Sequence, residues 1–400
     1  MKKMNKMLLA AVVMLLVASC TKKDIQPAPV GEAVPYTPPA TRKWQAVMKD
    51  PSYTYWNAAW RRSRMDTLVG GSGAAYYTVF MATDKAFTDA GWTMAKINAA
   101  DTADLDTLLA YHVAPGFYRP DNLSTLRGSL ALKTLLTSVH VADHSPGNPY
   151  IYKLYAGYQS DSLVIDGKAV NKWKTGEEAL NGYVYPIESL LKKPEMSMLQ
   201  YLESDPRFSL FLAAIRISDQ VYSDNYVSIF NEQFLAGNPD YGVVSTLFAP
   251  TNRAFENSGF HSAADIQAYV DMSLVDGYLP QPDYDSNFFY QQPVTAIDSL
   301  LFPHGLEAFR AGSGGGYITD LSFFTNDILL NGAAISGMLI KPGQLYNNPP
   351  VLVHLRFSSD NDRPMVLRLG SARAPLPLVE TNIKVLNGVI HVVDESLLLP

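Results

Sequence analysis

Histidines are the residues of this chain best suited to chemistry near neutral pH, because an imidazole can exchange a proton or bind a metal. His140 and His144 are four residues apart, a spacing that places two metal ligands on one face of a helix. The surrounding residues, "TLLTSVHVADHSPGNP", predict a strand and a turn instead. This pair therefore does not predict a metal site.

Two further histidines, His112 and His391, stand among apolar residues. They could contact a ligand, or they could be hydrogen bonded inside a core, as buried polar groups usually are. The apolar neighbours favour the second interpretation.

Two other segments resemble ligand-binding loops but lack an essential residue. Asp283–Asn287, "DYDSN", begins like a calcium loop, yet Phe288 and Val294 replace its glycine and its final glutamate. Gly312–Gly316, "GSGGG", lacks the lysine of a phosphate-binding loop. We therefore expect no metal, no cofactor and no catalytic residue from these motifs.

The single cysteine, Cys20, has a chemistry of its own. It follows three lysines and the apolar run Met7–Ala18, which as a helix is about 18 Å long and too short for a bilayer core of about 30 Å. This pattern is typical of a signal peptide, predicted here over residues 1–19. The end of the run resembles a lipobox, in which cleavage between Ser19 and Cys20 precedes attachment of a lipid to Cys20. Ordinary cleavage nearby is the alternative.

A proline-rich stretch, residues 20–43, follows the signal peptide and predicts an extended tether. The net charge of the chain is −6, and no basic run occurs in the mature part. Nucleic acid is therefore not an expected partner.

Tyrosines cluster in "NPYIYKLYAGYQ", Asn148–Gln159. The faces of Tyr150 and Tyr152 could stack on sugars. The two residues also alternate as on one side of a strand, which favours packing within a sheet.

The elements that position these residues are repeated along the chain. "DPSYTYWNAAWR" (Asp50–Arg61) returns as "DPRFSLFLAAIR" (Asp205–Arg216), each copy an Asp-Pro helix start followed by one buried face. "NGYVYPIESLL" (Asn181–Leu191) returns as "NGVIHVVDESL" (Asn387–Leu397). The order of the copies predicts a tandem duplication, with domains over 44–193 and 194–400.

A strand leading into a helix is also repeated, as "YTVFMATDKAF" and "STLFAPTNRAF". Thr83 and Asp84 in the first copy, and Thr251 and Asn252 in the second, could bind a ligand or cap the helix. Their place between strand and helix favours capping.

A third phrase, "SDSLVIDGKAV" (Ser160–Val170), returns as "TNDILLNGAAI" (Thr325–Ile335). Asp166-Gly167 and Asn331-Gly332 are typical hairpin turns, so both copies predict two strands.

The second copy carries an insertion at about 340–380. "VLVHLRF" and "MVLRL", separated by "SSDNDRP", predict a β-hairpin. Arg356 and Arg368 lie on it, so the hairpin could hold a surface that binds a partner. Covering the edge of a sheet is the alternative.

Together these phrases resemble the fasciclin domain family, over most of residues 44–400. "LLAYHVAPG", with Tyr111 and His112, resembles the Tyr-His segment of the family. The resemblance implies an α+β fold with two tandem fasciclin-like domains, each a wedge-shaped β-sandwich with helices packed at one end. In the second copy, residues 273–281 stand where the Tyr-His pair is expected, and Tyr185 stands where the other copy has His391. We therefore expect each copy to keep one family histidine.

The resemblance further implies adhesion or ligand binding at a cell surface rather than catalysis. With the lipobox, the chain resembles lipoproteins of Bacteroidetes-type bacteria. We expect a non-enzymatic lipoprotein, anchored by lipid in the outer membrane, that binds protein, matrix or glycan; surface display stays open. A glycan-capturing accessory of an outer-membrane uptake system and a hydrolase with an unrecognised site are the alternatives.

Overall fold

The computed structural model describes residues 40–124, 128–141, 149–172, 176–222, 244–272, 300–301, 304–306, 322–331, 334–339, 351–361 and 363–399. The predicted signal peptide, Cys20 and the tether up to Pro39 lie outside these residues, as do His144, "DYDSN" and "GSGGG". From Ala40 onward the chain forms one compact unit. Within the described ranges no helix is long and apolar enough to cross a membrane.

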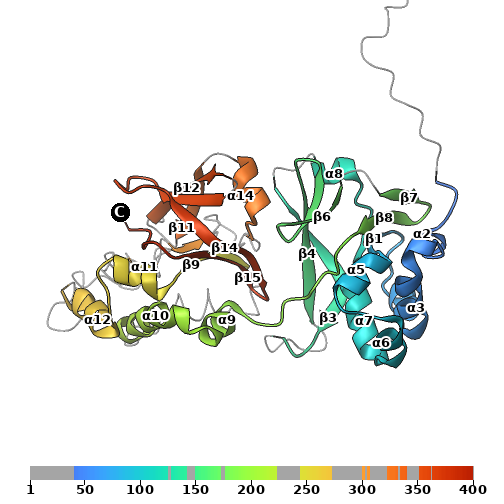
Figure 1. Cartoon of the computed structure of the whole chain (residues 1–400), viewed down its shortest axis with the longest axis horizontal. Coiled ribbons are helices and arrows are strands. Elements are labelled where there is room, and N and C mark those ends of the chain that lie inside the picture. Colours follow the sequence, from blue (N-terminus) through green and yellow to red (C-terminus); the bar gives the residue numbers. More distant parts are fainter. Residues whose placement is uncertain are drawn as a thin grey trace, which may run out of the picture. The chain divides into compact units, whose positions relative to one another are not determined.

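The first repeat contains two four-stranded sheets, ordered β2-β1-β8-β7 and β3-β4-β5-β6. Helices α3, α5, α6 and α7 lie together in one group, whereas α8 lies apart from them near β6 (Figure 1). The helical elements are α2 (Trp44–Val47), the 3-10 turn η1 (Pro51–Tyr53), α3 (Thr54–Arg62), α4 (Met65–Gly71), α5 (Asp84–Asp89), α6 (Met94–Ala99), α7 (Thr102–Tyr111) and α8 (Pro120–Ser124). The strands are β1 (Tyr77–Ala82), β2 (Val113–Pro115), β3 (Leu130–Ser138), β4 (Tyr150–Gln159), β5 (Ser162–Ile165), β6 (Lys168–Lys172), β7 (Glu177–Ala179) and β8 (Gly182–Ile187).

The core of the first repeat is formed by its helices and both of its sheets, and β1 runs through it. All residues of β1 are buried, as expected for a strand covered on both faces. Helix α3 buries Trp56, Ala59 and Trp60, the spacing of one helical face. Trp44 adds an edge-to-face contact with Trp60, at 5.2 Å between ring centroids.

The second repeat forms one seven-stranded sheet, ordered β10-β9-β15-β14-β13-β12-β11. Its helical elements are α9 (Met198–Ser204), the 3-10 turn η2 (Pro206–Phe208), α10 (Ser209–Tyr222), α11 (Asn252–Asn257), α12 (Ala263–Asp271) and α14 (Thr325–Asn331). The strands are β9 (Ser245–Pro250), β10 (Gly305–Leu306), β11 (Ala334–Leu339), β12 (Val351–Asp360), β13 (Arg363–Arg368), β14 (Leu376–Val385) and β15 (Gly388–Val393). Register shifts within β14 bend this strand.

The central strand pairs are the same in both repeats. β1 runs parallel to β8, with Tyr77 opposite Gly182, and β9 runs parallel to β15, with Ser245 opposite Gly388. A Cβ atom on either glycine would lie 1.9 Å from the carbonyl oxygen of its partner. Only glycine permits this close pairing, which explains the repeated Asn-Gly phrase. The α+β fold class is confirmed.

Two segments that match in the sequence, around Asp166-Gly167 and over Thr325–Asn331, adopt different structures. In the first repeat, Asp166 and Gly167 have φ of 51° and 75° and join β5 to β6, which confirms the predicted hairpin. In the second, the predicted strand over 325–330 is wrong, because Thr325–Asn331 is helix α14. The reason is a cap at its start: Asp327 Oδ2 accepts a hydrogen bond from the amide of Phe324 at 2.8 Å.

The predicted hairpin in the insertion is confirmed as β12 and β13. It lies between β14 and β11, so it lengthens the sheet instead of standing apart from it. Leu355, Phe357 and Val366 from this hairpin are buried in an apolar cluster with Phe248 and Val393. The hairpin is therefore part of the second repeat's core.

Candidate functional site

Thr83 and Asp84, at the start of α5, accept hydrogen bonds from the backbone amides of two helices. Thr83 Oγ1 accepts a hydrogen bond from the amide of Ala86 at 3.3 Å and caps α5. Asp84 Oδ1 accepts one from the amide of Tyr55 at 2.8 Å, in the first turn of α3. The predicted capping by Thr83 is confirmed, and Asp84 adds a link to α3.

The second repeat reproduces both contacts. Thr251 Oγ1 accepts from the amide of Ala254 at 3.4 Å, and Asn252 Oδ1 accepts from the amide of Leu210 at 2.9 Å. Thr251 Oγ1 also donates to Asp394 Oδ1 at 2.6 Å. All four polar groups are thus engaged inside their own repeat.

His112 is completely buried, and both ring nitrogens have partners. Nε2 lies 3.0 Å from the amide nitrogen of Leu191, which can only donate, so Nε2 accepts. Nδ1–H therefore donates to the carbonyl of Leu108 at 2.8 Å. Burial lowers the pKa of His112 to about 4, so the ring is neutral at pH 7.

His304 also uses both ring nitrogens in the second repeat, although its Nδ1 partner lies on β9 and not on a preceding helix. Its Nδ1–H donates to the carbonyl of Phe248 at 2.7 Å, and its Nε2 accepts from the amide of Leu398 at 3.2 Å. Burial lowers its pKa to about 4 as well.

The strand register shows that His304 corresponds to His112. His112 precedes β2, whose Val113 pairs with Val79 of β1. His304 precedes β10, whose Gly305 pairs with Leu247, the same position in β9. The expectation that the second copy lacks this histidine is therefore wrong. Sequence reasoning placed the segment at 273–281, outside the described residues; the signal it missed is a histidine beside the apolar "LLF" of 300–302.

The remaining family position holds His391 in one repeat and Tyr185 in the other. His391 Nε2–H donates to the carbonyl of Phe323 at 2.8 Å, and its ring stacks on Phe248 at 5.6 Å. Burial lowers its pKa to about 4. Tyr185 donates to the carbonyl of Tyr118 at 2.9 Å. The second repeat therefore carries both histidines and the first repeat one.

Tyr111, the neighbour of His112, lies at a contact between the two repeats. Its hydroxyl is 2.8 Å from Nζ of Lys384, which comes from β14. The same Nζ donates to both carboxylate oxygens of Asp166 at 2.8 Å and to the carbonyl of Lys153 at 2.5 Å. Burial and the charge of Asp166 raise the pKa of Tyr111 well above its usual value.

This ion pair between the repeats is shielded from water. The side chains of Lys384 and Asp166 are 12% and 15% exposed. Asp166 also accepts from the amide of Tyr155 at 3.0 Å, and the ammonium group lies 5.2 Å from the centre of the Tyr155 ring. The charges are therefore matched by short bonds on both sides.

Further bonds surround the ion pair. Asn382 Nδ2 donates to the carbonyl of Gly167 at 3.0 Å, and Asp327 Oδ1 accepts from the amide of Ser129 at 2.5 Å. Burial raises the pKa of Asp327. A buried apolar cluster of Tyr155, Phe324 and Val389 also joins the repeats.

Tyr150 and Tyr152, the candidate sugar-stacking residues, pack within the molecule. Their rings meet edge to face at 4.9 Å, and Tyr152 is 5% exposed. The hydroxyl of Tyr150 donates to the carbonyl of Leu386 in the second repeat at 2.6 Å. This geometry favours the interpretation as sheet packing.

The two arginines of the inserted hairpin lie on opposite faces of the sheet. Residues directly opposite each other in an antiparallel pair share a face. Arg368 is opposite the buried Leu355, whereas the exposed Arg356 is opposite Leu367. The structure therefore does not bring Arg356 and Arg368 together on one surface, as the binding hypothesis expected.

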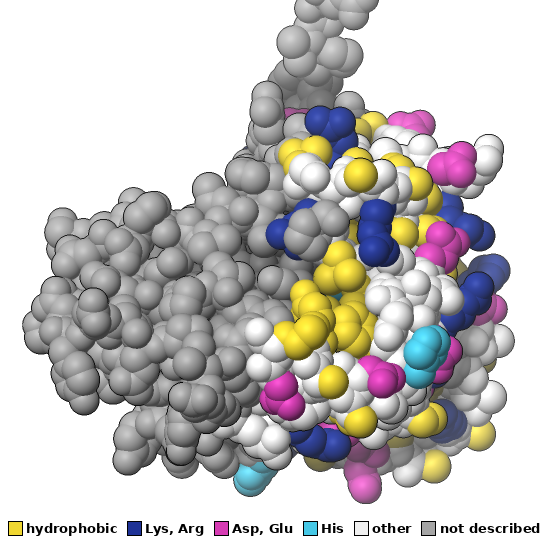
Figure 2. Space-filling view, turned by 90° about the vertical axis from the view of Figure 1, so that its left-hand side faces the viewer, with side chains coloured by type: hydrophobic (Ala, Val, Ile, Leu, Met, Phe, Trp, Pro, Cys, Tyr) yellow, Lys and Arg dark blue, Asp and Glu magenta, His cyan; other side chains and the backbone are white. Residues whose placement is uncertain are grey.

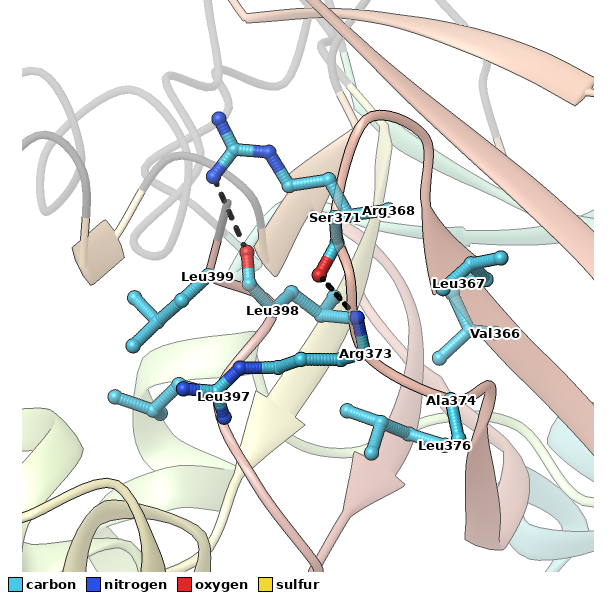
Figure 3. A pocket seen from close by; sticks show the side chains of 10 residues that line it. All are labelled: Val366, Leu367, Arg368, Ser371, Arg373, Ala374, Leu376, Leu397, Leu398 and Leu399. Carbon is cyan, nitrogen blue, oxygen red and sulfur yellow. Dashed lines mark hydrogen bonds between the residues drawn. The ribbon is translucent and has the colours of Figure 1, made fainter.

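Arg368 holds the C-terminal segment in place (Figure 3). Its Nη1 donates to the carbonyl of Leu398 at 3.3 Å, and burial lowers its pKa. Arg368, Arg373 and apolar residues around Leu398 line a hollow of about 10 Å³. That volume holds a single water molecule at most.

A larger groove, of about 420 Å³, lies beside α7. Its floor includes Leu108 and Tyr111, and its rim carries both signs of charge, from Asp104 and Lys192 among others. The volume falls within the range of small-molecule sites, about 300–1,000 Å³. The mixed rim does not select one class of ligand.

The residues that the structure describes contain no group of three or more His, Cys, Asp or Glu side chains that could hold a metal ion. Figure 2 shows a face on which described hydrophobic side chains form a small group near Lys and Arg side chains. Such groups are common on protein surfaces, so this one does not identify a site by itself.

Comparisons with known proteins give one family match and similar solved structures. The model of the fasciclin domain family matches residues 53–193. No curated protein sequence matches the chain. Among solved structures, the chain is similar to a FAS1 domain pair from the insect cell adhesion molecule fasciclin I, with 15% sequence identity, 86% of this chain and 96% of that chain covered, and a TM-score of 0.32.

Proposed function

Residues 53–193 form a fasciclin domain, which makes the chain a member of the fasciclin-domain family, and on that premise we propose that the protein is a non-enzymatic adhesion or binding protein of the cell envelope. Fasciclin domains are of the cell-adhesion type. The second repeat shares the strand pairing of the first, so the binding unit is a pair of such domains.

The proposal rests on the observation that the polar residues of the repeated motifs make hydrogen bonds inside the domain. Thr83 and Asp84 bond to backbone amides, and His112 uses both ring nitrogens inside the core. A neutral histidine with a pKa of about 4 and no access to solvent is a poor general base at pH 7. These residues stabilise the domain, so we expect surface side chains to contact the partner.

The lipid anchor at Cys20 and a place in the outer membrane complete the proposal. The basic start, the short apolar run and the small residues before Cys20 support them. The partner is a protein, matrix component or glycan outside the anchored body. The mild negative charge supports none of the nucleic-acid-binding classes.

Two measurements test the proposal. Replacement Cys20→Ala should abolish metabolic labelling of the protein with a fatty acid and leave an unprocessed precursor. The matched variant Ser19→Ala keeps a small residue before the cysteine and should be labelled normally. Unchanged labelling of Cys20→Ala would refute the lipid anchor.

The binding role is tested with cells that lack or carry the intact gene. Attachment to immobilised matrix proteins and to a glycan array should fall when the gene is deleted and return with the wild-type chain. Equal attachment in both strains, on every surface, would reject adhesion. An activity screen of the purified protein against ester and glycoside substrates should stay at the blank level.

A further inference from the structure

The starts of β1 and β8 and the ends of β2 and β7 meet at one end of their sheet, which we call its edge here. Tyr77 at the start of β1 pairs with Pro115 at the end of β2 and with Gly182 at the start of β8. Gly182 in turn pairs with Ala179 at the end of β7. The residues just outside these pairs, including Tyr76, Phe117 and Leu180, therefore lie at this one edge.

This edge carries exposed apolar side chains. Tyr76 is 48% exposed and Leu180 is 55% exposed. The Tyr76 ring stacks on Phe117 at 5.5 Å, and the guanidinium of Arg119 lies 4.6 Å from the centre of the Phe117 ring on the surface. We call Tyr76, Phe117 and Leu180 the aromatic edge. Exposed apolar side chains that lie side by side are one feature of surfaces that contact membranes or partners.

Two arginines beside the aromatic edge are paired with glutamates. Arg42 donates to both carboxylate oxygens of Glu177, each at 2.7 Å, and Arg119 lies 3.3 Å from the carboxylate of Glu178. The rim is therefore close to neutral, and it neither repels nor requires a charged headgroup. An apolar centre with Tyr at its border and neutralised cations beside it is the composition of membrane–water interfaces.

The chain reaches the folded body at this same edge. The carbonyl of Arg42 accepts a hydrogen bond from the amide of Leu180 at 2.9 Å, and Asn181 Oδ1 accepts one from the amide of Trp44 at 3.0 Å. Only the residues between Cys20 and Ala40 separate this point from the proposed lipid. A chain of that length spans at most about 70 Å. The tether therefore joins the folded body beside the aromatic edge and is long enough for this edge to reach the bilayer.

We propose that the aromatic edge rests on the phospholipid surface to which Cys20 anchors the chain. The inference depends on the lipid anchor of the proposed function and adds an orientation to it. Tethering by a short linker gives an effective concentration in the millimolar range, so a weak contact is enough to keep the edge on the membrane. A soluble partner would gain no such advantage from the position of this edge.

Single-cysteine spin labelling tests the proposal on the lipoprotein in phosphatidylethanolamine vesicles. Cys20 is the only cysteine of the chain, and its thiol is consumed by the lipid, so an introduced cysteine is the one reactive thiol. A nitroxide at Leu180→Cys should be accessible to oxygen and shielded from a water-soluble nickel complex. The control, at Met272→Cys, stands on a side chain that is 77% exposed and should be open to nickel. Equal nickel accessibility at both positions would overturn the proposal.

A second variant separates the aromatic contact from nonspecific adsorption. Tyr76→Glu, combined with Leu180→Cys, places a carboxylate at the contact and should return the label to water. A label that stays shielded in this variant would reject the role of Tyr76. Shielding that appears only when a protein or glycan is added would show a docking surface for that partner and also reject the proposal. Absence of fatty-acid labelling would be a failure of the lipid anchor, which the same sample reports independently.

Discussion

Replacing Lys384 by methionine should weaken the coupling between the two repeats. The change removes the ammonium group that bonds to Asp166, Tyr111 and the carbonyl of Lys153. Methionine keeps a similar apolar stem, so the main loss is electrostatic. Breaking a buried pair by removing one partner costs about 3–5 kcal/mol. Asp166 is 15% exposed and keeps its bond from the Tyr155 amide, so we expect about 2–3 kcal/mol.

The assay is urea unfolding followed by two signals. Trp44, Trp56, Trp60, Trp92 and Trp173 are the tryptophans of the chain, and all belong to the first repeat, so their fluorescence reports on that repeat. Far-ultraviolet circular dichroism reports on both repeats. In the wild type the two transitions should coincide, and in Lys384→Met they should separate. Lys168→Met, at an exposed position beside the Asp166 turn, is the control and should change neither signal.

The double variant Asp166→Asn, Lys384→Met gives the decisive comparison. With both charges gone, no uncompensated buried charge remains, so the double variant should be less destabilised than the sum of the single variants, by about 1–3 kcal/mol. Additive effects, or an unfolding free energy of Lys384→Met equal to that of the wild type, would refute the argument that this ion pair joins the repeats.

Two further predictions concern residues inside each repeat. Asp84→Ala removes the acceptor for the Tyr55 amide and should cost about 1 kcal/mol in unfolding free energy. Asn252→Ala should cost a similar amount, because it removes the acceptor for the Leu210 amide. Urea midpoints equal to the wild type would contradict the role of these two links between helices. Burial lowers the pKa of His304 to about 4 from an unfolded value near 6.5, so the unfolded chain binds the extra proton. The contribution of neutral His304 to the unfolding free energy is complete above pH 6.5, and about 3 kcal/mol of it is lost as the pH falls toward 4. His304→Gln should therefore lose less unfolding free energy than the wild type between pH 6.5 and pH 4. An unchanged dependence of the unfolding free energy on pH would show that other groups cause the loss.

Local signals predicted the parts of the fold that depend on neighbouring residues. The threonine between strand and helix, the Asp166-Gly167 turn and the inserted hairpin follow from capping and turn chemistry that acts within a few residues. Thr325–Asn331 was predicted wrongly because a short apolar run is compatible with either strand or helix. Its cap, Asp327, could have indicated the helix.

Most of the candidate site could not be predicted from the sequence, because it depends on contacts between residues that are far apart along the chain. His304 was missed because the segment that leads to β10 differs in length between the repeats, and only the strand pairing shows which histidine corresponds to His112. The faces of Arg356 and Arg368 follow from alternation with Leu355 and Val366, so they could have been predicted. The bond between Lys384 and Asp166 joins residues from different repeats, and nothing in either segment alone points to it.

The ion pair between the repeats also makes the two copies of the duplicated unit chemically unequal. Lys384 lies three residues before Asn387, and the same position in the first repeat, three residues before Asn181, is Glu178. Asn331, which matches Asp166 in the sequence, lies at the end of helix α14 and not in a hairpin turn. Neither repeat therefore contains both partners of the pair. The bond can form only between a first repeat and a second repeat, and not between two copies of the same one.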